Sequence, residues 1–243
     1  MDTAVILAGG FGTRLRPLTA IMPKPLLPVA GKPVLQWSLD LLSKYGFKKA
    51  ILTISYKADL IQKYFGNRYK DIEIVYFVEE EPLGNAGAFN FLKEHLKNTF
   101  LELHGDVLME LDIEKMYELH KRKNALATLA LKSWGFEDSS SLSRAIVNED
   151  MISEFQYKPK KEDAKSDLMF LGAALIEPKT LYLIKDKKVA DVDKDLYEPI
   201  IAQGKMGGYV SLGDIENTDT IERYSKANAL WNNPIAKEIL EKN

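Results

Sequence analysis

The residues best suited to chemistry in this sequence lie close to its N-terminus. Residues 4–12 read A-V-I-L-A-G-G-F-G, and Arg14, Arg16 and Lys24 follow them. An apolar strand that opens into a glycine-rich turn lets backbone N–H groups approach phosphate oxygens, because glycine carries no Cβ. The basic side chains then supply positive charge beside the same oxygens. The segment therefore predicts a binding site for a nucleoside triphosphate.

Two later segments carry related signals. Residues 79–88 read E-E-E-P-L-G-N-A-G-A, where glycines at the start of an expected helix would let a flat base pack against the backbone. Residues 101–108 read L-E-L-H-G-D-V-L, an apolar strand that ends in Gly-Asp. This pattern places the carboxylate of Asp106 at the carboxyl edge of a sheet, where ligands of open α/β sheets bind.

The glycine turn fits neither of two common nucleotide motifs. A G-x-G-x-x-G fingerprint would need a third glycine at Leu15, and the chain has no G-x-x-x-x-G-K-[ST] loop. The whole run L-A-G-G-x-G-T-R-L-x-P-L-T, followed by P-K-P-L-L-P-V-x-G-K-P, instead resembles the sugar-1-phosphate nucleotidyltransferases. Enzymes of that family join a nucleoside triphosphate to a sugar 1-phosphate and release pyrophosphate. The resemblance implies an α/β, Rossmann-like fold with a mixed, mostly parallel sheet flanked by helices.

The resemblance also implies roles for individual residues. Arg14 would hold the leaving β- and γ-phosphates and Lys24 would stabilise the transition state, which suits a reaction that brings polyanions together. Asp106 lies in a segment similar to the family's N-G-D-V-L motif, whose aspartate binds Mg²⁺, although His104 stands where asparagine is usual. The nucleotide-binding residues implied are Leu7, Ala8, Gly9, Gly10, Gly12, Thr13, Arg14, Glu79, Pro82, Gly84 and Asn85.

The sequence leaves two choices for a second magnesium carboxylate. Residues 209–220 read Y-V-S-L-G-D-I-E-N-T-D-T, in a segment similar to the family's W-x-D-I-G-T-P. Alignment on the glycine places Ser211 at the carboxylate position, whereas a shifted alignment places Asp214 there, with Asp219 close by. A serine cannot replace the charge of a carboxylate. We therefore expect Asp214 to bind the metal together with Asp106.

The part of the site expected to bind the sugar phosphate departs further from the family pattern. In F-Q-Y-K-P, Lys158 is kept and would contact the sugar phosphate, while Tyr157 replaces the usual glutamate. Ala145 replaces the glycine of Y-G-V-V, and the segment around Gly172 lacks the asparagine of N-x-G-I-Y. These four are the predicted sugar-phosphate residues. The changes remove partners for sugar hydroxyls, on which specificity for a hydroxylated ligand depends.

Glu79 stands where thymidylyl and uridylyl enzymes tend to have glutamine. This resembles mannose-1-phosphate guanylyltransferases and favours a Mg²⁺-dependent transfer from GTP to a hexose or heptose 1-phosphate.

Two alternatives to this function stay open. The aromatic face of Tyr157 would also suit an unusual acceptor, such as a modified sugar phosphate or phosphocholine. Ser211 and the altered sugar pocket would suit a non-catalytic subunit that binds a nucleotide sugar.

The elements that must position these residues follow from the apolar pattern. Apolar runs alternate with helical periods, which predicts a mostly parallel sheet covered by helices. Expected strands lie near 3–8, 49–55, 72–78, 99–104 and 125–131, then near 144–148, 151–156 and 168–176, some of the latter antiparallel. Expected helices lie near 33–45, 57–65, 85–96, 112–123, 178–184, 193–203, 216–231 and 235–241. We expect one domain, 1–243, with a nucleotide-binding half (1–131), an acceptor half (132–243) and no β-helix.

The composition limits other functions. The 243 residues carry a net charge of −2 with a pI near 6.0, which gives no basic field for nucleic acid or an anionic membrane. With no cysteine there is no disulfide or thiol nucleophile, and three histidines argue against a histidine-rich metal site. No apolar stretch reaches the ~20 residues of a membrane span, so we expect a cytoplasmic protein. The resemblance implies a nucleoside triphosphate and a sugar 1-phosphate as small-molecule partners, and a homo-oligomer.

Overall fold

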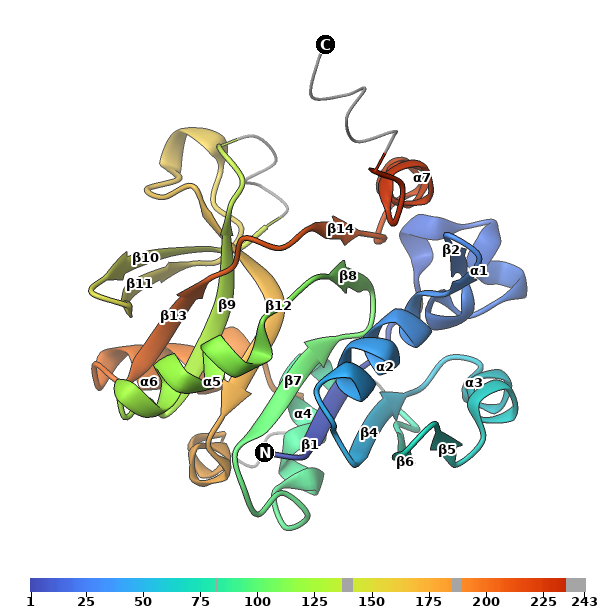
Figure 1. Ribbon diagram of the computed structural model, residues 1–243, viewed down its shortest axis with the longest axis horizontal. Coiled ribbons are helices and arrows are strands. Elements are labelled where there is room, and N and C mark those ends of the chain that lie inside the picture. Colours follow the sequence, from blue (N-terminus) through green and yellow to red (C-terminus); the bar gives the residue numbers. More distant parts are fainter. Residues whose placement is uncertain (82, 137–141, 185–188, 235–243) are drawn as a thin grey trace.

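The computed structural model describes residues 1–81, 83–136, 142–184 and 189–234. Its centre is a ten-stranded mixed sheet that continues through both expected halves of the chain (Figure 1). Across the sheet, the strands are β10 (Arg144–Asn148), β11 (Met151–Gln156), β13 (Met206–Val210), β9 (Ala127–Ser133), β12 (Leu168–Ile176), β7 (Phe100–His104), β1 (Thr3–Leu7), β4 (Lys49–Ile54), β6 (Ile72–Val78) and β5 (Arg68–Tyr69).

Four neighbouring strands in this sheet run parallel. Strands β7, β1, β4 and β6 pair in parallel register, and they arise from the apolar runs that the sequence predicts as buried strands. Such strands are continuously apolar because helices cover both of their faces. Their carboxyl ends therefore meet at one edge of the sheet, from which the glycine turn, the E-E-E-P segment and the Gly-Asp segment all begin.

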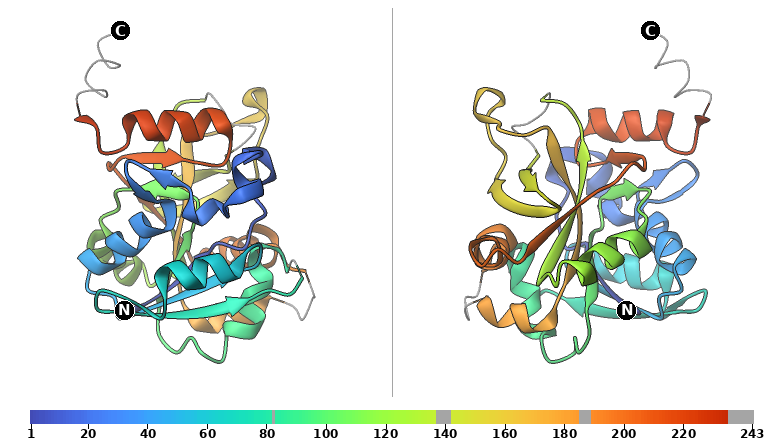
Figure 2. Two further views of the ribbon diagram at one scale, coloured as in Figure 1. Left: turned by 90° about the vertical axis from the view of Figure 1, so that its right-hand side faces the viewer. Right: turned by 60° about the vertical axis from the view of Figure 1, so that its left-hand side comes forward.

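Helices pack on both faces of the sheet (Figure 2). On the first face, α2 (Val34–Lys44), α3 (Ala58–Phe65) and α5 (Ile113–Arg122) share one buried apolar cluster. On the second face lie α4 (Gly84–Leu92), η5 (Pro178–Leu183), η6 (Asp193–Tyr197) and α6 (Glu198–Ala202).

Strand β7 contributes to both faces, because side chains alternate along a strand. It sends Leu101 and Leu103 to the first face and Phe100 to the second. By the same alternation, Glu102 and His104 lie on the second face.

The second half of the chain adds antiparallel pairs. Strand β12 pairs antiparallel with both β7 and β9, whereas β13 pairs parallel with β9. Strands β10 and β11 form an antiparallel hairpin. The remaining elements are β2 (Pro28–Val29) with β3 (Lys32–Pro33), β8 (Val107–Met109) with β14 (Ile215–Asn217), η1 (Thr13–Leu15), α1 (Leu18–Ile21), η2 (Lys24–Leu26), η4 (Lys161–Asp163) and α7 (Ile221–Leu230).

The sequence-based prediction is wrong near residue 216. The expected helix 216–231 begins only at Ile221, because the side chain of Thr220 caps it by accepting a hydrogen bond from Arg223 N. The residues before this cap form β14, which was not expected, and β13 was also not expected. The predicted helix 235–241 lies outside the described residues. Among the helices that the structure describes, none is long and apolar enough to cross a membrane.

Candidate active site

A cleft of about 400 Å³ opens at the carboxyl edge of the parallel strands. Strands β1, β4, β6 and β7 each supply residues to it at or just beyond their last residue, which is the usual ligand position in open α/β sheets. Its lining consists of Leu7, Ala8, Gly9, Gly10, Phe11, Gly12, Thr13, Arg14, Lys24, Pro25, Thr53, Ser55, Glu79, Gly84, His104, Gly105, Asp106 and Asp219.

Most of the residues predicted to handle the nucleotide come together in this cleft. Arg14, Lys24 and Asp106 line it, as do all the predicted glycines of the first segment. Pro82 lies outside the described residues. Asn85 falls in the first turn of α4, and its side chain is also outside the described part.

The glycine turn is held in place by the helix that follows it. Gly12 has φ +61°, a conformation that favours glycine, and a Cβ there would lie 2.8 Å from Cγ2 of Thr19. The hydroxyl of Thr19 also donates a hydrogen bond to the carbonyl oxygen of Gly12 at 2.8 Å. The turn and α1 are therefore packed too closely for a side chain at position 12.

Lys24 reaches the cleft from η2, between two prolines. Its side chain is only 10% exposed, and its Nζ lies 2.5 Å from Oδ2 of Asp106. Burial by itself raises the pKa of the Asp106 carboxyl, but the ammonium of Lys24 and the ring of His104 bring that pKa below its ordinary value. Asp106 therefore carries its negative charge next to a nearly enclosed ammonium group.

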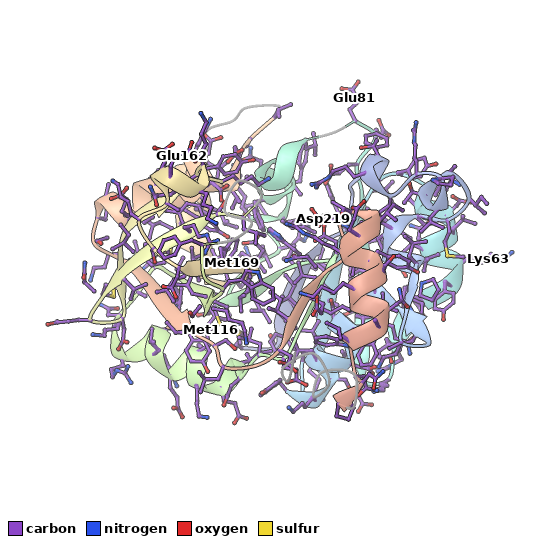
Figure 3. All side chains as sticks on the ribbon, turned by 90° about the horizontal axis from the view of Figure 1, so that it is seen from above. Lys63, Glu81, Met116, Glu162, Met169 and Asp219 are labelled. Carbon is purple, nitrogen blue, oxygen red and sulfur yellow. The ribbon has the colours of Figure 1, made fainter. Side chains whose placement is uncertain are left out.

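Arg14 is also paired with a carboxylate. Its Nη1 lies 2.9 Å from Oδ2 of Asp219, and the other oxygen of Asp219 accepts from Arg223 Nη1 at 2.9 Å. Figure 3 places Asp219 at the N-terminal end of α7. The guanidinium of Arg14 is 63% exposed, so it can exchange this partner for phosphate oxygens in the cleft.

The structure brings Asp219, rather than Asp214, to the cleft. Strands β14 and β8 pair antiparallel, and the backbone N–H of Glu110 donates to the carbonyl of Asp214 at one end of this pair. At the other end, Thr218 donates both its N–H and its hydroxyl to the carbonyl oxygen of Asp106.

This register favours Asp219 over Asp214 as the second carboxylate of the cleft, while metal binding by either residue stays a prediction. Asp214 lies opposite Glu110, and four residues of extended chain, about 13 Å, separate it from Thr218. Ser211 is buried on the same side, where its hydroxyl contacts the carbonyl oxygen of Glu110 at 3.4 Å. The signal for Asp219 was present in the sequence, but only the β8–β14 register selects it.

Glu79 lies where β6 leaves the sheet and contributes a carboxylate to the cleft. Its Oε1 is 3.6 Å from the place that a Cβ on Gly9 would take, and the N–H of Leu83 approaches its Oε2 at 3.4 Å. Burial raises the pKa of this carboxyl. The side chain therefore presents hydrogen-bond acceptors to a ligand beside the glycine turn.

The predicted sugar-phosphate residues do not line this cleft. Ala145 is fully buried in the apolar cluster of the second face. Tyr157 is 54% exposed, and the Nζ of Lys158 lies 5.0 Å from the centre of its ring. Gly172 has φ +73°, and a Cβ there would lie 2.7 Å from Nδ1 of His104, so it packs directly against a residue of the cleft.

Comparison with known proteins identifies the family. The model of the family "Nucleotidyl transferase" matches residues 3–231. The chain belongs to the nucleotidyl transferase family. This confirms the expected sugar-1-phosphate nucleotidyltransferase family and enzyme class.

Individual relatives agree with this family. The chain is 33% identical over 216 residues to a UTP–glucose-1-phosphate uridylyltransferase of Synechocystis sp., an alignment that covers 83% of this chain and 55% of the relative. It is also 33% identical over 211 residues to a D-glycero-α-D-manno-heptose 1-phosphate guanylyltransferase of Aneurinibacillus thermoaerophilus, covering 86% and 89% of the two chains. The chain thus spans about half the length of the first relative and most of the second.

A solved structure shows the same fold. The UDP-glucose pyrophosphorylase of Acinetobacter baumannii superimposes with a TM-score of 0.83 over 100% of both chains, at 17% identity. The α/β fold with a mixed sheet flanked by helices, which the resemblance implies, is therefore confirmed.

The carboxylates of this nucleotidyl transferase fit the ligand set that Mg²⁺ takes from proteins. Asp106 and Asp219 line one cleft, each next to a cation that a phosphate can draw away. No group of three or more acidic, histidine or cysteine side chains forms a metal cluster within the described ranges. Two carboxylates are sufficient, because Mg²⁺ completes its coordination with phosphate oxygens and water.

Sequence reasoning missed a buried polar group behind the cleft. Glu102 is fully buried, accepts a hydrogen bond from the hydroxyl of Tyr197 at 2.7 Å, and lies 3.6 Å from Nε2 of His104. Burial alone would lower the pKa of His104, but the carboxylate of Glu102 reverses this and raises it. The available signal was a glutamate in the middle of an otherwise apolar strand.

Proposed function

We propose that this nucleotidyl transferase moves a nucleoside monophosphate, preferably from GTP, to a hexose or heptose 1-phosphate and releases pyrophosphate. The observation that carries the proposal is the Lys24–Asp106 pair, which lies beside Arg14 in a glycine-lined cleft. These are the groups that a reaction between two polyanions requires: enclosed positive charge, backbone N–H groups and a carboxylate for a metal.

The transfer is a displacement at the α-phosphorus. An oxygen of the sugar 1-phosphate forms a bond to this phosphorus, the bond to the bridging oxygen breaks, and its electron pair leaves with pyrophosphate. Lys24 is compact and nearly enclosed, so it stabilises the charge that develops at the α-phosphate. Arg14 is longer, more exposed and planar, so it binds oxygens of the leaving pyrophosphate bidentately.

Asp106 and Asp219 would hold Mg²⁺ at the cleft. When bound, the ion neutralises charge on the phosphates. Binding of the triphosphate moves Lys24 and Arg14 from these two carboxylates to phosphate oxygens. Asp106 and one oxygen of Asp219 would then be open to a cation, while the other oxygen of Asp219 keeps its contact with Arg223.

The preference for GTP rests on the chemistry of Glu79. A carboxylate only accepts hydrogen bonds, and guanine presents two adjacent donors, N1–H and the N2 amino group. Uracil and thymine present a single N3–H between two carbonyl oxygens, which a carboxylate would repel. The relative from A. thermoaerophilus, a guanylyltransferase by name, supports the same base.

The two alternatives have less support from the site. A quaternary ammonium acceptor would need the free face of Tyr157, but the ammonium of Lys158 already lies over that ring. A non-catalytic subunit would have no need of the enclosed Lys24, paired with Asp106 and aimed into the cleft.

Pyrophosphate release across the four common nucleoside triphosphates and a panel of sugar 1-phosphates, with and without Mg²⁺, tests the proposal. We expect Mg²⁺-dependent release that is greatest with GTP and a hexose or heptose 1-phosphate. Turnover that is greatest with phosphocholine would favour the unusual acceptor. Binding of a nucleotide sugar without any turnover would favour the non-catalytic subunit.

A further inference from the structure

Several polar side chains lie buried on the second face of the sheet, just behind the cleft. Three aromatic rings, those of Phe155, Phe170 and Tyr197, pack edge to face at 5.9–6.2 Å around this place. His104 packs edge-on against Phe170 at 5.7 Å and reaches forward into the cleft. The region is therefore a largely apolar layer that carries a few polar groups and adjoins the cleft at His104.

The hydrogen bonds among these groups do not balance. The hydroxyl of Tyr197 satisfies one oxygen of Glu102, whereas the other oxygen, Oε1, faces Nε2 of His104 at 3.6 Å, beyond hydrogen-bond distance. Neither of these two buried atoms has a hydrogen bond to another group in the described part of the chain. Native proteins leave few buried polar atoms unpaired, and functional sites are where such exceptions occur.

Asp193 adds a further unpaired group to this place. It is 7% exposed, and no hydrogen bond or ion pair to its carboxyl group is found among the residues that the structure describes. Its neighbours differ from it: Asp191 accepts hydrogen bonds from the N–H groups of Asp193 and Lys194, and Asp195 accepts from the N–H of Asp191. Asp191 and Asp195 thus fix the turn, whereas the carboxyl of Asp193 is left for another partner.

Charged groups of the cleft and of the predicted sugar-phosphate segment both act on the carboxyl of Asp193. The groups that act on its carboxyl are Asp191, His104, Glu102 and Lys158. His104 belongs to the cleft, next to Asp106, and Lys158 is the residue expected to contact the sugar phosphate. Burial, followed by the charge of Asp191, raises the pKa of Asp193 to about 7.

The segment before Asp193 is tied to the wall of the cleft. The N–H of Ala190 donates to the carbonyl of Leu83 at 3.0 Å, and the N–H of Ala86 donates to the carbonyl of Ala190 at 3.2 Å. Residues 83–86 carry Gly84 of the cleft, so η6 and the nucleotide site are joined through the backbone. The segment that leads into Asp193 is therefore joined to the wall of the cleft.

We propose that Asp193 is a specificity-determining residue that binds a hydroxyl group of the acceptor sugar. The inference rests on the proposed transfer to a sugar 1-phosphate and names the residue that recognises the sugar. Asp193 would take the place of the family's glutamate and asparagine, the hydroxyl-binding residues that are replaced by Tyr157 and Phe170 in this chain. A hydroxyl can donate to the carboxylate or accept from the acid, so either form of Asp193 provides a hydrogen bond.

The experiment compares Asp193→Ala and Asp193→Asn with the unmodified chain. KM and kcat are measured with GTP and the best sugar 1-phosphate, and again with deoxy analogues that each lack one hydroxyl. For Asp193→Ala we expect KM for the sugar phosphate to rise about 10- to 100-fold, with KM for GTP changed less than about twofold. With the one deoxy analogue that lacks the hydroxyl bound by Asp193, Asp193→Ala and the unmodified chain should have the same KM.

Asp191→Asn is the matched control. It removes the same charge two residues away, while its side-chain oxygen still accepts from the turn, so KM for the sugar phosphate should stay within about twofold. An unchanged KM in Asp193→Ala, or the same loss with every analogue, would overturn the inference. Circular dichroism and melting curves show that each variant is folded, and Asp193→Asn keeps the shape of the side chain if Asp193→Ala does not fold.

A direct measurement of sugar 1-phosphate binding tests this inference independently of the proposed function. If the unmodified chain turns over no substrate pair, the proposed function fails, but calorimetric titration with the same sugar 1-phosphates still tests Asp193. Weaker binding by Asp193→Ala than by the unmodified chain would support the inference. Equal binding, or no binding by the unmodified chain, would overturn it.

Discussion

At the scale of single residues, both cations that would act on phosphate are held by carboxylates. Lys24 lies against Asp106, and Arg14 lies against Asp219. These pairs keep the cations oriented toward the cleft before substrate arrives. Removal of either cation therefore has two effects. The transition state loses a stabilising positive charge, and the carboxylate loses the partner that holds its side chain in position.

Lys24→Met should reduce kcat by about 100- to 1,000-fold, because the substitution removes an enclosed positive charge from the α-phosphate while keeping an unbranched side chain of similar size. Pyrophosphate release under saturating substrates measures the loss. Lys32→Met is the control, since Lys32 pairs with Asp40 and lies outside the lining of the cleft. Near-normal turnover in Lys24→Met would refute the assignment.

Glu79→Gln should change the base that the enzyme prefers. An amide offers one donor and one acceptor, which suits the N3–H and a carbonyl of uracil or thymine and no longer matches the two donors of guanine. We expect kcat/KM for GTP to fall about 10-fold and the ratio of UTP or dTTP to GTP to rise. Competition assays with mixed nucleotides measure this ratio. The exposed Glu80→Gln should leave it unchanged.

At the scale of elements, the short pair of β8 and β14 determines which acidic residue reaches the cleft. Thr218 is fully buried, and its two hydrogen bonds to the backbone of Asp106 join the end of β14 to the end of β7. The next residue, Asp219, then turns toward Arg14, while Asp214 remains at the far end beside Glu110.

Asp219→Asn should raise the Mg²⁺ concentration for half-maximal activity by about 10-fold, because one of two carboxylates in the cleft loses its charge. Asp214→Asn should change that concentration less than about twofold, since Asp214 lies at the other end of β14. Mg²⁺ titrations of pyrophosphate release compare the two variants. An effect at Asp214 equal to or larger than that at Asp219 would contradict the β14 register as the explanation.

At the scale of the whole molecule, the second face of the sheet is not uniformly apolar. Glu102 and Asp193 are buried there and His104 is partly buried, all beside aromatic rings, at a cost in stability that a purely apolar face would not have. The first face carries α2, α3 and α5 on a continuous apolar cluster and can supply the compensating stability.

Asp193→Asn should stabilise the protein at pH 8 but not at pH 4. The pKa of Asp193 is raised from 3.8 to about 7 in the folded state, so the folded chain binds the extra proton between these values and stability falls as pH rises through this window. Asparagine cannot ionise and avoids that loss, which we expect to be on the order of 4 kcal/mol above pH 7. Denaturant unfolding at several pH values measures the difference. A constant difference across pH would refute the shifted pKa.

The sequence by itself determined the parallel strands and the glycine turn, because these depend on local patterns, and its resemblance to the family supplied the roles predicted for Arg14, Lys24 and Asp106. Apolar runs indicate buried strands, and a glycine turn with basic residues after such a strand indicates a phosphate site. Only the tertiary structure decided between Ser211, Asp214 and Asp219, because the choice depends on the register of two strands far apart in sequence. It also brought Asp193 beside Glu102 and His104, since contact across ninety residues leaves no periodic signal in the chain.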